Sequence, residues 1–124
     1  MASFHLQSLL KVVFAVSCLL FAAGIAGADI CGSPGDGYTE QDPKSVLSVY
    51  LGRFAVKRHN FINNTNLEYQ NVAKLLSKPL LNGVIFKHII NIQAKDGGQS
   101  HQYYACLEEW KLELVVELQS FRQL

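Results

Sequence analysis

The stretch Leu51-Gly52-Arg53-Phe54-Ala55-Val56-Lys57-Arg58-His59-Asn60 decides the fold of this chain. Its apolar residues continue a helical spacing that begins one turn earlier, so the sequence predicts an amphipathic helix. Gly52 costs this helix up to about 1 kcal/mol relative to alanine. The asparagines between residues 60 and 64 predict where the helix ends, because asparagine favours C-caps and turns. The predicted inner stripe contains Leu47, Leu51, Phe54, Ala55 and Ile62, with Arg58 at its edge.

After Asn66 the apolar spacing changes from helical to alternating, which predicts antiparallel strands separated by turns. The turn signals are Asn82-Gly83 and Asp96-Gly97-Gly98. One helix on a four-stranded meander is the economical α+β arrangement, because each buries the apolar side of the other. Strands are predicted at residues 67–72, 84–94, 103–107 and 112–121, with Tyr69 and Val72 on opposite faces of the first, and Leu112, Leu114, Val116 and Leu118 on one face of the last.

Residues 1–28 have the composition of a signal peptide. Lys11 is the only charged residue there, an apolar run follows from Val12 to Ala23, and small residues end the segment at Ala28. The run is too short for a convincing membrane anchor, although an uncleaved anchor is the alternative. We expect cleavage after Ala28, secretion, and a mature chain of Asp29–Leu124.

The mature chain is expected to contain a flexible leader at 29–45, where glycine and proline are frequent, and one compact domain at 46–124. The whole chain has a formal net charge of +1, so loss of Lys11 leaves it close to neutral. A nucleic acid or an anionic membrane would require a basic excess on one face. The charge balance therefore predicts neither partner for the mature chain.

Two cysteines, Cys31 and Cys106, remain after cleavage. In an oxidising compartment they are a candidate disulfide, which would close a long loop and add up to about 4 kcal/mol of stability. Two free thiols are the alternative. Asn63-Asn64-Thr65 is a glycosylation sequon, so Asn63 is a candidate N-glycosylation site, with an unmodified polar turn as the alternative.

The sequence offers little for catalysis or metal binding. A thiol–imidazole pair would need Cys106, which is predicted in the middle of a strand without a helix N-terminus to activate its thiol. The histidines also lack the close spacing of a metal site. We therefore predict no catalytic residue, no metal and no cofactor. The histidines considered as partners of Cys106 are His59, His88 and His101.

Leu51–Val56 followed by His59-Asn60 resembles the helix signature of plant cystatins, which are protein inhibitors of papain-like cysteine proteases. In that family the stretch reads Leu-Ala-Arg-Phe-Ala-Val, then two variable residues and His-Asn. The resemblance covers essentially the whole mature chain, and it implies the cystatin fold, in which one helix packs on a wrapped sheet of four to five antiparallel strands. Further matches are Leu67-Glu68-Tyr69 after the helix, and Tyr103-Tyr104-Ala105 and Leu118-Gln119-Ser120-Phe121 in the last two strands.

Plant cystatins inhibit through three elements at one end of the sheet, and the first is a leader glycine. The resemblance assigns this role to Gly37, since Asp36-Gly37-Tyr38 stands where many plant members have Gly-Gly-Trp. A residue without a side chain lets the backbone lie close to an enzyme surface. The alternative is a glycine that only keeps the leader flexible.

The other two elements are hairpin loops. The family's Gln-x-Val-x-Gly loop corresponds to Lys78–Gly83, with Leu81 in place of valine and no glutamine. The family's Pro-Trp loop corresponds to Lys111-Leu112, with Trp110 one place early. Ordinary turns, and a tryptophan that covers the sheet, are the alternatives. The implied protease-binding residues are Gly37, Lys78, Pro79, Leu80, Leu81, Asn82, Gly83, Trp110, Lys111 and Leu112.

The resemblance implies a monomeric, reversible and competitive inhibitor of papain-like cysteine proteases, and no enzymatic activity. Such an inhibitor would act in plant defence or in the control of endogenous proteolysis. The altered loops leave an alternative open, which is a cystatin-fold binding module with weak or no inhibition.

Overall fold

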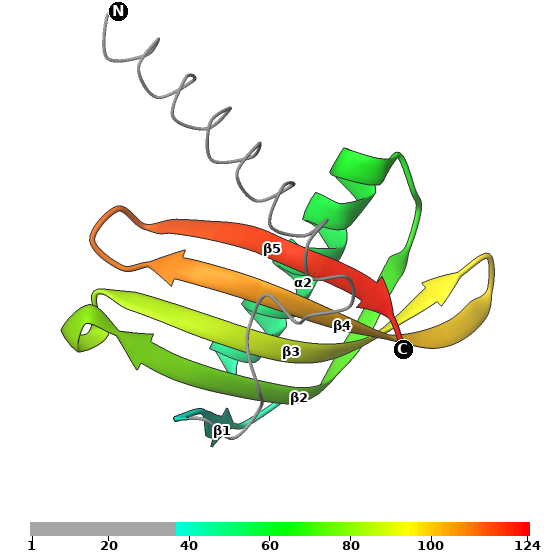
Figure 1. Ribbon diagram of the computed structural model, residues 1–124. Coiled ribbons are helices and arrows are strands. Elements are labelled where there is room, and N and C mark those ends of the chain that lie inside the picture. The colour runs from blue at the N-terminus through cyan, green and yellow to red at the C-terminus, as the bar shows by residue number, and fades with distance from the viewer. Residues whose placement is uncertain (1–36) are drawn as a thin grey trace, which may run out of the picture.

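The computed structural model describes residues 37–124 as one helix packed against one antiparallel sheet (Figure 1). The sheet order β1-β2-β3-β4-β5 follows the chain, which confirms the predicted α+β class. Within the described residues, no helix is long and apolar enough to cross a bilayer. The elements are β1 at Thr39–Gln41, α2 at Val46–Asn63, β2 at Glu68–Leu80, a short 3-10 turn η1 at Leu81–Gly83, β3 at Ile85–Asp96, β4 at Gln99–Trp110 and β5 at Val115–Gln123.

Residues 1–36 lie outside the description, and with them the predicted signal peptide, Asp36 and Cys31. The sheet begins earlier than the predicted domain boundary at residue 46, because β1 pairs as an edge strand with β2. Part of the predicted flexible leader is therefore a strand. Cys106 is disulfide-bonded, and its predicted partner Cys31 is among the residues outside the description.

The ends of α2 follow ordinary capping chemistry. Ser45 is the N-cap, and its Oγ accepts a hydrogen bond of 3.1 Å from the backbone N–H of Ser48. Asn64 is the C-cap in the left-handed conformation, with φ 54° and ψ 45°. The helix thus ends within the predicted run of asparagines.

The Asn60 side chain joins the end of α2 to the chain that enters β2. Its Nδ2 donates to the Leu67 carbonyl, and its Oδ1 accepts from the Leu67 backbone N–H, both at 2.9 Å. The hydroxyl of Thr65 also donates to Oδ1, at 2.9 Å. One side chain therefore satisfies the polar groups of the connection and fixes the angle between helix and strand.

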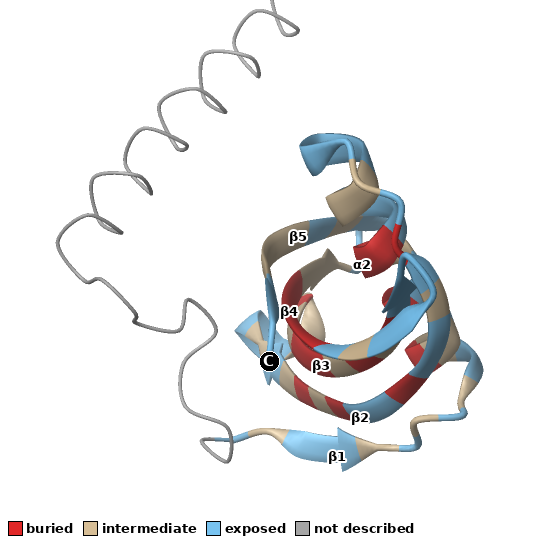
Figure 2. Cartoon of the chain, turned by 90° about the vertical axis from the view of Figure 1, so that its right-hand side faces the viewer, coloured by how far each residue is buried: buried red, intermediate tan, exposed pale blue. Residues whose placement is uncertain are grey.

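The helix packs on the concave face of a sheet that curls around it, as the end view in Figure 2 shows. Leu51 and Ala55 are completely buried there, together with Ser48, Gly52 and Val56. The prediction was wrong for Ile62, which is exposed, because the last turn of α2 extends beyond the sheet (Figure 1).

Two irregularities in β2 produce the curvature. The pairing of β2 with β3 shifts between Tyr69 and Asn71 and again between Val72 and Lys74, which are the positions of β-bulges. The predicted alternation placed Tyr69 and Val72 on opposite faces, but the first bulge turns both side chains toward Gly52. An extra residue in a strand moves the residues that follow it, as far as the next bulge, to the opposite face of the sheet.

A second, smaller apolar cluster lies on the outer face of the sheet. Its buried members are Ile89, Tyr104 and Cys106, and Tyr38 and Leu76 pack against them. Since Tyr38 comes directly before β1, this contact holds the start of the described chain against the sheet. The larger cluster between α2 and the sheet contains residues from α2 and from β2 to β5.

We predict that Gly52→Ala destabilises the protein although alanine is the better helix former. A Cβ at residue 52 would lie 2.7 Å from Val72 Cγ2 and 2.8 Å from Tyr69 Cε2, distances at which a neighbour must move. Valine is stiff at χ1, and the adjacent Leu51 is completely buried, so the helix cannot retreat freely. Overpacking of about 1–3 kcal/mol should exceed the gain of up to about 1 kcal/mol in helix propensity.

Urea unfolding of the wild type, Gly52→Ala, Val72→Ala and the double variant measures this balance. The loss caused by Gly52→Ala should shrink in the Val72→Ala background, because the closest contact is then gone. A Gly52→Ala protein more stable than the wild type would show that the close approach is not tight.

Candidate functional site

Two hairpin tips lie side by side at one end of the sheet (Figure 1). The first tip is η1 between β2 and β3, and the second is the four-residue turn at 111–114 between β4 and β5. The backbone N–H of Lys111 donates to the Val84 carbonyl at 2.9 Å, so one hydrogen bond joins the bases of the two tips. The predicted loops therefore lie next to each other.

The first tip is shorter than the predicted loop. Lys78, Pro79 and Leu80 are the last residues of β2 and pair with β3, so only Leu81–Gly83 form the tip. All three tip residues have positive φ, namely 48°, 56° and 84°. Asparagine and glycine tolerate this region, but leucine is strained there.

The second tip occupies residues that were predicted to be the start of the last strand. β5 begins at Val115, not at Leu112, and Leu114 has a φ of 53°. The alternating pattern of residues 112–118 hides the turn, because no glycine, proline or asparagine marks it. Leu114 is therefore a candidate site residue that the sequence did not identify.

The two tips present three leucine side chains to solvent. Leu81 is 70 % exposed, Leu112 is 82 % exposed and Leu114 is 91 % exposed. Leu81 and Leu114 also have strained backbones, and exposed apolar side chains at such positions are typical of a binding surface.

Trp110 is the last residue of β4 and lies below the second tip. It is partly buried and stands opposite Ile85 on β3 and Val115 on β5, so these side chains share the outer face of the sheet. This position agrees with a tryptophan that covers the sheet, and it leaves the apex of the tip to Leu112 and Leu114.

Gly37 lies near the same end of the sheet as the tips. β1 runs antiparallel to β2, with Thr39 opposite Ser77, so the chain before β1 approaches the last residues of β2. Gly37 has a φ of 81°, and a Cβ there would lie 3.2 Å from Lys78 Cε. The Lys78 ammonium also sits 5.7 Å from the centre of the Tyr38 ring. A side chain at residue 37 would disturb this arrangement.

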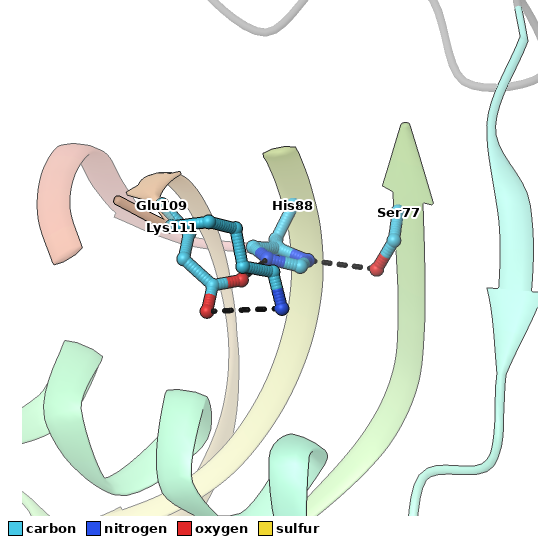
Figure 3. Close-up of polar contacts among 4 residues, drawn as sticks. All are labelled: Ser77, His88, Glu109 and Lys111. Atoms are coloured by element: carbon cyan, nitrogen blue, oxygen red, sulfur yellow. Dashed lines mark hydrogen bonds and ion pairs between the residues drawn. The ribbon is translucent and has the colours of Figure 1, made fainter. Parts of the chain in front are cut away.

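A buried polar network supports the second tip from inside the sheet (Figure 3). Ser77 Oγ lies 2.7 Å from His88 Nδ1, and His88 Nε2 lies 2.9 Å from Glu109 Oε1. The other carboxylate oxygen of Glu109 is 3.6 Å from Lys111 Nζ. The network thus connects β2, β3 and β4 with the first residue of the tip.

The partners define the tautomer of His88. A carboxylate only accepts hydrogen bonds, so Nε2 carries the proton and donates to Glu109. In the neutral ring, Nδ1 then accepts from the Ser77 hydroxyl. Burial lowers the pKa of His88, although the hydrogen bond and the negative charge of Glu109 act in the opposite direction.

The burial of this network gives it a structural role, because a substrate has no access to it. Ser77 and His88 are 5 % and 1 % exposed, so a substrate carbonyl cannot reach the serine hydroxyl. A thiol–imidazole pair between His88 and Cys106 is excluded, because Cys106 is disulfide-bonded and pairs with Ile89, whose side chain lies on the other face from His88.

The remaining predicted residues lie away from the tips. Asn63 is exposed at the end of α2, and its Nδ2 donates to the His59 carbonyl at 3.1 Å. The His59 ring stacks on Phe121, with ring centres 4.0 Å apart. Within residues 37–124, no group of three or more His, Cys, Asp or Glu side chains is arranged to hold a metal ion.

We predict that the free energy of unfolding falls as the pH is lowered from about 7 to about 5. Because burial lowers the pKa of His88 below the ordinary value of 6.5, the unfolded chain binds this proton more readily than the folded protein. The stabilisation is complete above pH 6.5 and is lost as the pH falls toward the pKa of the folded state. Burial also lowers the pKa of His59, so both rings contribute with the same sign.

Denaturant unfolding of the wild type, His88→Gln and His59→Gln across this pH range separates the contributions of the two rings to the pH dependence of the free energy of unfolding. At neutral pH, His88→Gln should be less stable than the wild type by about 1–3 kcal/mol, because buried partners lose their bonds. The difference should narrow at acid pH, since only the wild type loses stability by protonation of residue 88. A difference that widens at acid pH would contradict the assignment.

Comparison with known proteins supports the fold. No protein-family model matches the chain, and no curated protein matches its sequence. Among solved structures, it is similar to a salivary cystatin of the soft tick Ornithodoros moubata, with a TM-score of 0.60 over 71 % of this chain and 96 % of the tick protein. The sequence identity is 15 %, so the likeness concerns the fold alone. The chain therefore has the cystatin fold that its helix motif implied.

Proposed function

We propose that this protein is a reversible, competitive inhibitor of papain-like cysteine proteases. The supporting observation is geometric, since the Gly37 segment and the two tips lie at one end of the sheet, and the tips carry three exposed leucines. Such an end has the shape of a wedge that enters a cleft. The leucines are the apolar anchors, and the glycine allows the backbone to lie close to the protease.

The tips would occupy the cleft without being cleaved. A protease positions its substrate in an extended conformation, whereas residues 81–83 form a tight turn with positive φ. The scissile geometry is therefore absent, and no covalent step is needed. An interface of about 800 Å² per partner is sufficient for tight binding when the binding surface is rigid.

The rigidity of the tips comes from contacts behind them. The Lys111 N–H to Val84 carbonyl bond holds one tip against the other, and Glu109 holds the Lys111 ammonium. The Lys111 ammonium also lies 5.0 Å from the centre of the Phe86 ring. Because these contacts exist before binding, little conformational entropy is lost when a partner arrives.

The departures from the family's loops predict weaker binding than an intact plant cystatin would show. The first tip lacks the glutamine amide, and Trp110 lies below the second tip instead of at its apex. A binding module with the cystatin fold and weak or no inhibition is the alternative function. The tip leucines would then contact a different partner.

We further propose that the protein belongs to the plant branch of the cystatins and is secreted as a monomer after cleavage at Ala28. The helix motif at Leu51–Asn60 supports the plant branch, and the composition of residues 1–28 supports secretion. The role would be defence, or control of the organism's own cysteine proteases.

The test is a titration of papain and several other papain-like endopeptidases with protein purified from the medium of a secreting eukaryotic host. We expect a Kd at or below about 100 nM, roughly −9.5 kcal/mol, for at least one member. Leu81→Ser and Leu114→Ser should each weaken inhibition about tenfold or more, because each loses an apolar anchor.

Leu124→Ser is the matched control. Leu124 is also exposed, but its backbone N–H bonds to the Gln102 carbonyl near the opposite end of the sheet, so inhibition should not change. Folded protein that inhibits no member at micromolar concentration would contradict the proposal and favour the binding-module alternative. Equal weakening by Leu124→Ser would contradict binding through the tips.

A further inference from the structure

The side of α2 that faces away from the sheet carries exposed apolar and basic side chains. Val46, Tyr50, Arg53, Lys57 and Phe61 follow one another at helical spacing, opposite the buried residues, and we call them the outer stripe. Val46 is 88 % exposed, Tyr50 is 55 % exposed and Phe61 is 78 % exposed. The outward face of a helix in a soluble domain is normally polar, so the fold itself does not explain these apolar residues.

A shallow groove follows the first part of the outer stripe. Tyr50 and Phe54 form its aromatic part, with ring centres 6.4 Å apart. Lys44, Arg53 and Lys57 contribute its positive charge. The lining thus combines cations with apolar surface, which suits a partner that is both anionic and apolar.

No acid on the helix neutralises these cations. The described helix contains Arg53, Lys57 and Arg58 and neither Asp nor Glu. Within residues 37–124, no carboxylate forms an ion pair with Arg53, Lys57 or Arg58. Arg53 and Arg58 lie over the rings of Tyr69 and Phe61, at 5.6 Å and 5.5 Å.

The helix is therefore locally basic although the charges of the whole chain nearly cancel in sum. Acidic residues gather in β4, β5 and the turn between them, at 108, 109, 113 and 117. An approaching surface experiences only the charges within a Debye length, about 8 Å at physiological ionic strength. The near-neutral total does not exclude an anionic surface as partner of α2, contrary to the expectation from composition.

We propose that the outer stripe of α2, together with Lys44 and Arg58, binds the surface of an anionic phospholipid bilayer. Three basic residues on α2 and Lys44 just before its N-cap make a cluster of four, the number at which binding to anionic lipids is expected. The stripe is about 22 Å long, and it combines basic side chains with exposed apolar ones along one face, as helices that lie on an anionic lipid surface do. Val46, Tyr50 and Phe61 enter the headgroup region, while the cations contact the phosphates.

This binding mode leaves the hairpin tips free. The outer stripe lies on the far side of α2 from the sheet, and the tips project from one end of that sheet (Figures 1 and 2). A protein bound to lipid through α2 still presents Leu81 and Leu114 to a second partner. The proposal does not depend on protease inhibition, because lipid binding is measured without a protease.

The experiment measures sedimentation of the secreted mature product with vesicles of phosphatidylcholine alone and of an equal mixture with phosphatidylserine. We expect binding to the mixed vesicles only, and weaker binding as salt is raised. Arg53→Glu combined with Lys57→Glu should reduce the partition coefficient about tenfold or more, since two attractive charges become repulsive. Tyr50→Ser combined with Phe61→Ser should also reduce it, because both lose apolar insertion.

Lys74→Glu combined with Lys95→Glu is the matched control, because it changes the net charge equally at exposed positions of β2 and β3. Its binding should stay within about twofold of the wild type after circular dichroism has verified folding. Three results would overturn the proposal: no binding to mixed vesicles, equal binding to both vesicle types, or an equal loss in the control. A dimer in sedimentation velocity that Tyr50→Ser with Phe61→Ser abolishes, without lipid binding, would identify a second copy as the partner and also overturn it.

Discussion

The close approach of α2 to β2 at Gly52 is the constraint on which the rest of the structure depends. Because residue 52 has no side chain, Val72 and Tyr69 occupy the space where its Cβ would be. The bulges of β2 turn these two side chains to the same face and bend the sheet around the helix. Asn60 then fixes the exit of the helix through its bonds to Leu67. The curvature of the sheet comes from the bulges, and the close approach at Gly52 lets the helix fit into it.

A curved meander whose hairpins end together provides a stiff base for two exposed tips. The His88 network occupies the interior beside the tips, and Lys111 is bonded both to Glu109 and to the neighbouring hairpin. Buried polar groups that are fully bonded favour one arrangement over its alternatives. The strained backbone of Leu81 and Leu114 therefore persists because its surroundings are rigid. The contacts that stabilise this end of the sheet therefore lie below the tips, and the exposed apolar surface lies on the tips.

The helix and the first turn were predicted from local sequence patterns. The features that the sequence did not predict depend on contacts between strands. The helix motif at Leu51–Asn60 and the Asn82-Gly83 turn were readable because capping and turn formation depend on nearby residues. The side of the sheet on which Val72 lies could not be predicted, since a bulge arises from pairing with another strand. Leu114 has no local turn signal, and its positive φ results from hairpin closure. The partners of His88 come from different strands and share no spacing in the sequence.

The outer stripe illustrates why composition alone cannot exclude a partner. Each residue of a helix faces one direction, and the inner residues of α2 are chosen by packing against the sheet, as Leu51 shows. The outer residues have no such constraint, so polar side chains there would preserve the fold equally well. Tyr50 and Phe61 gain little from burial where they stand, and they reduce solubility. Their presence beside unpaired cations is therefore better explained by an external surface than by the stability of the domain.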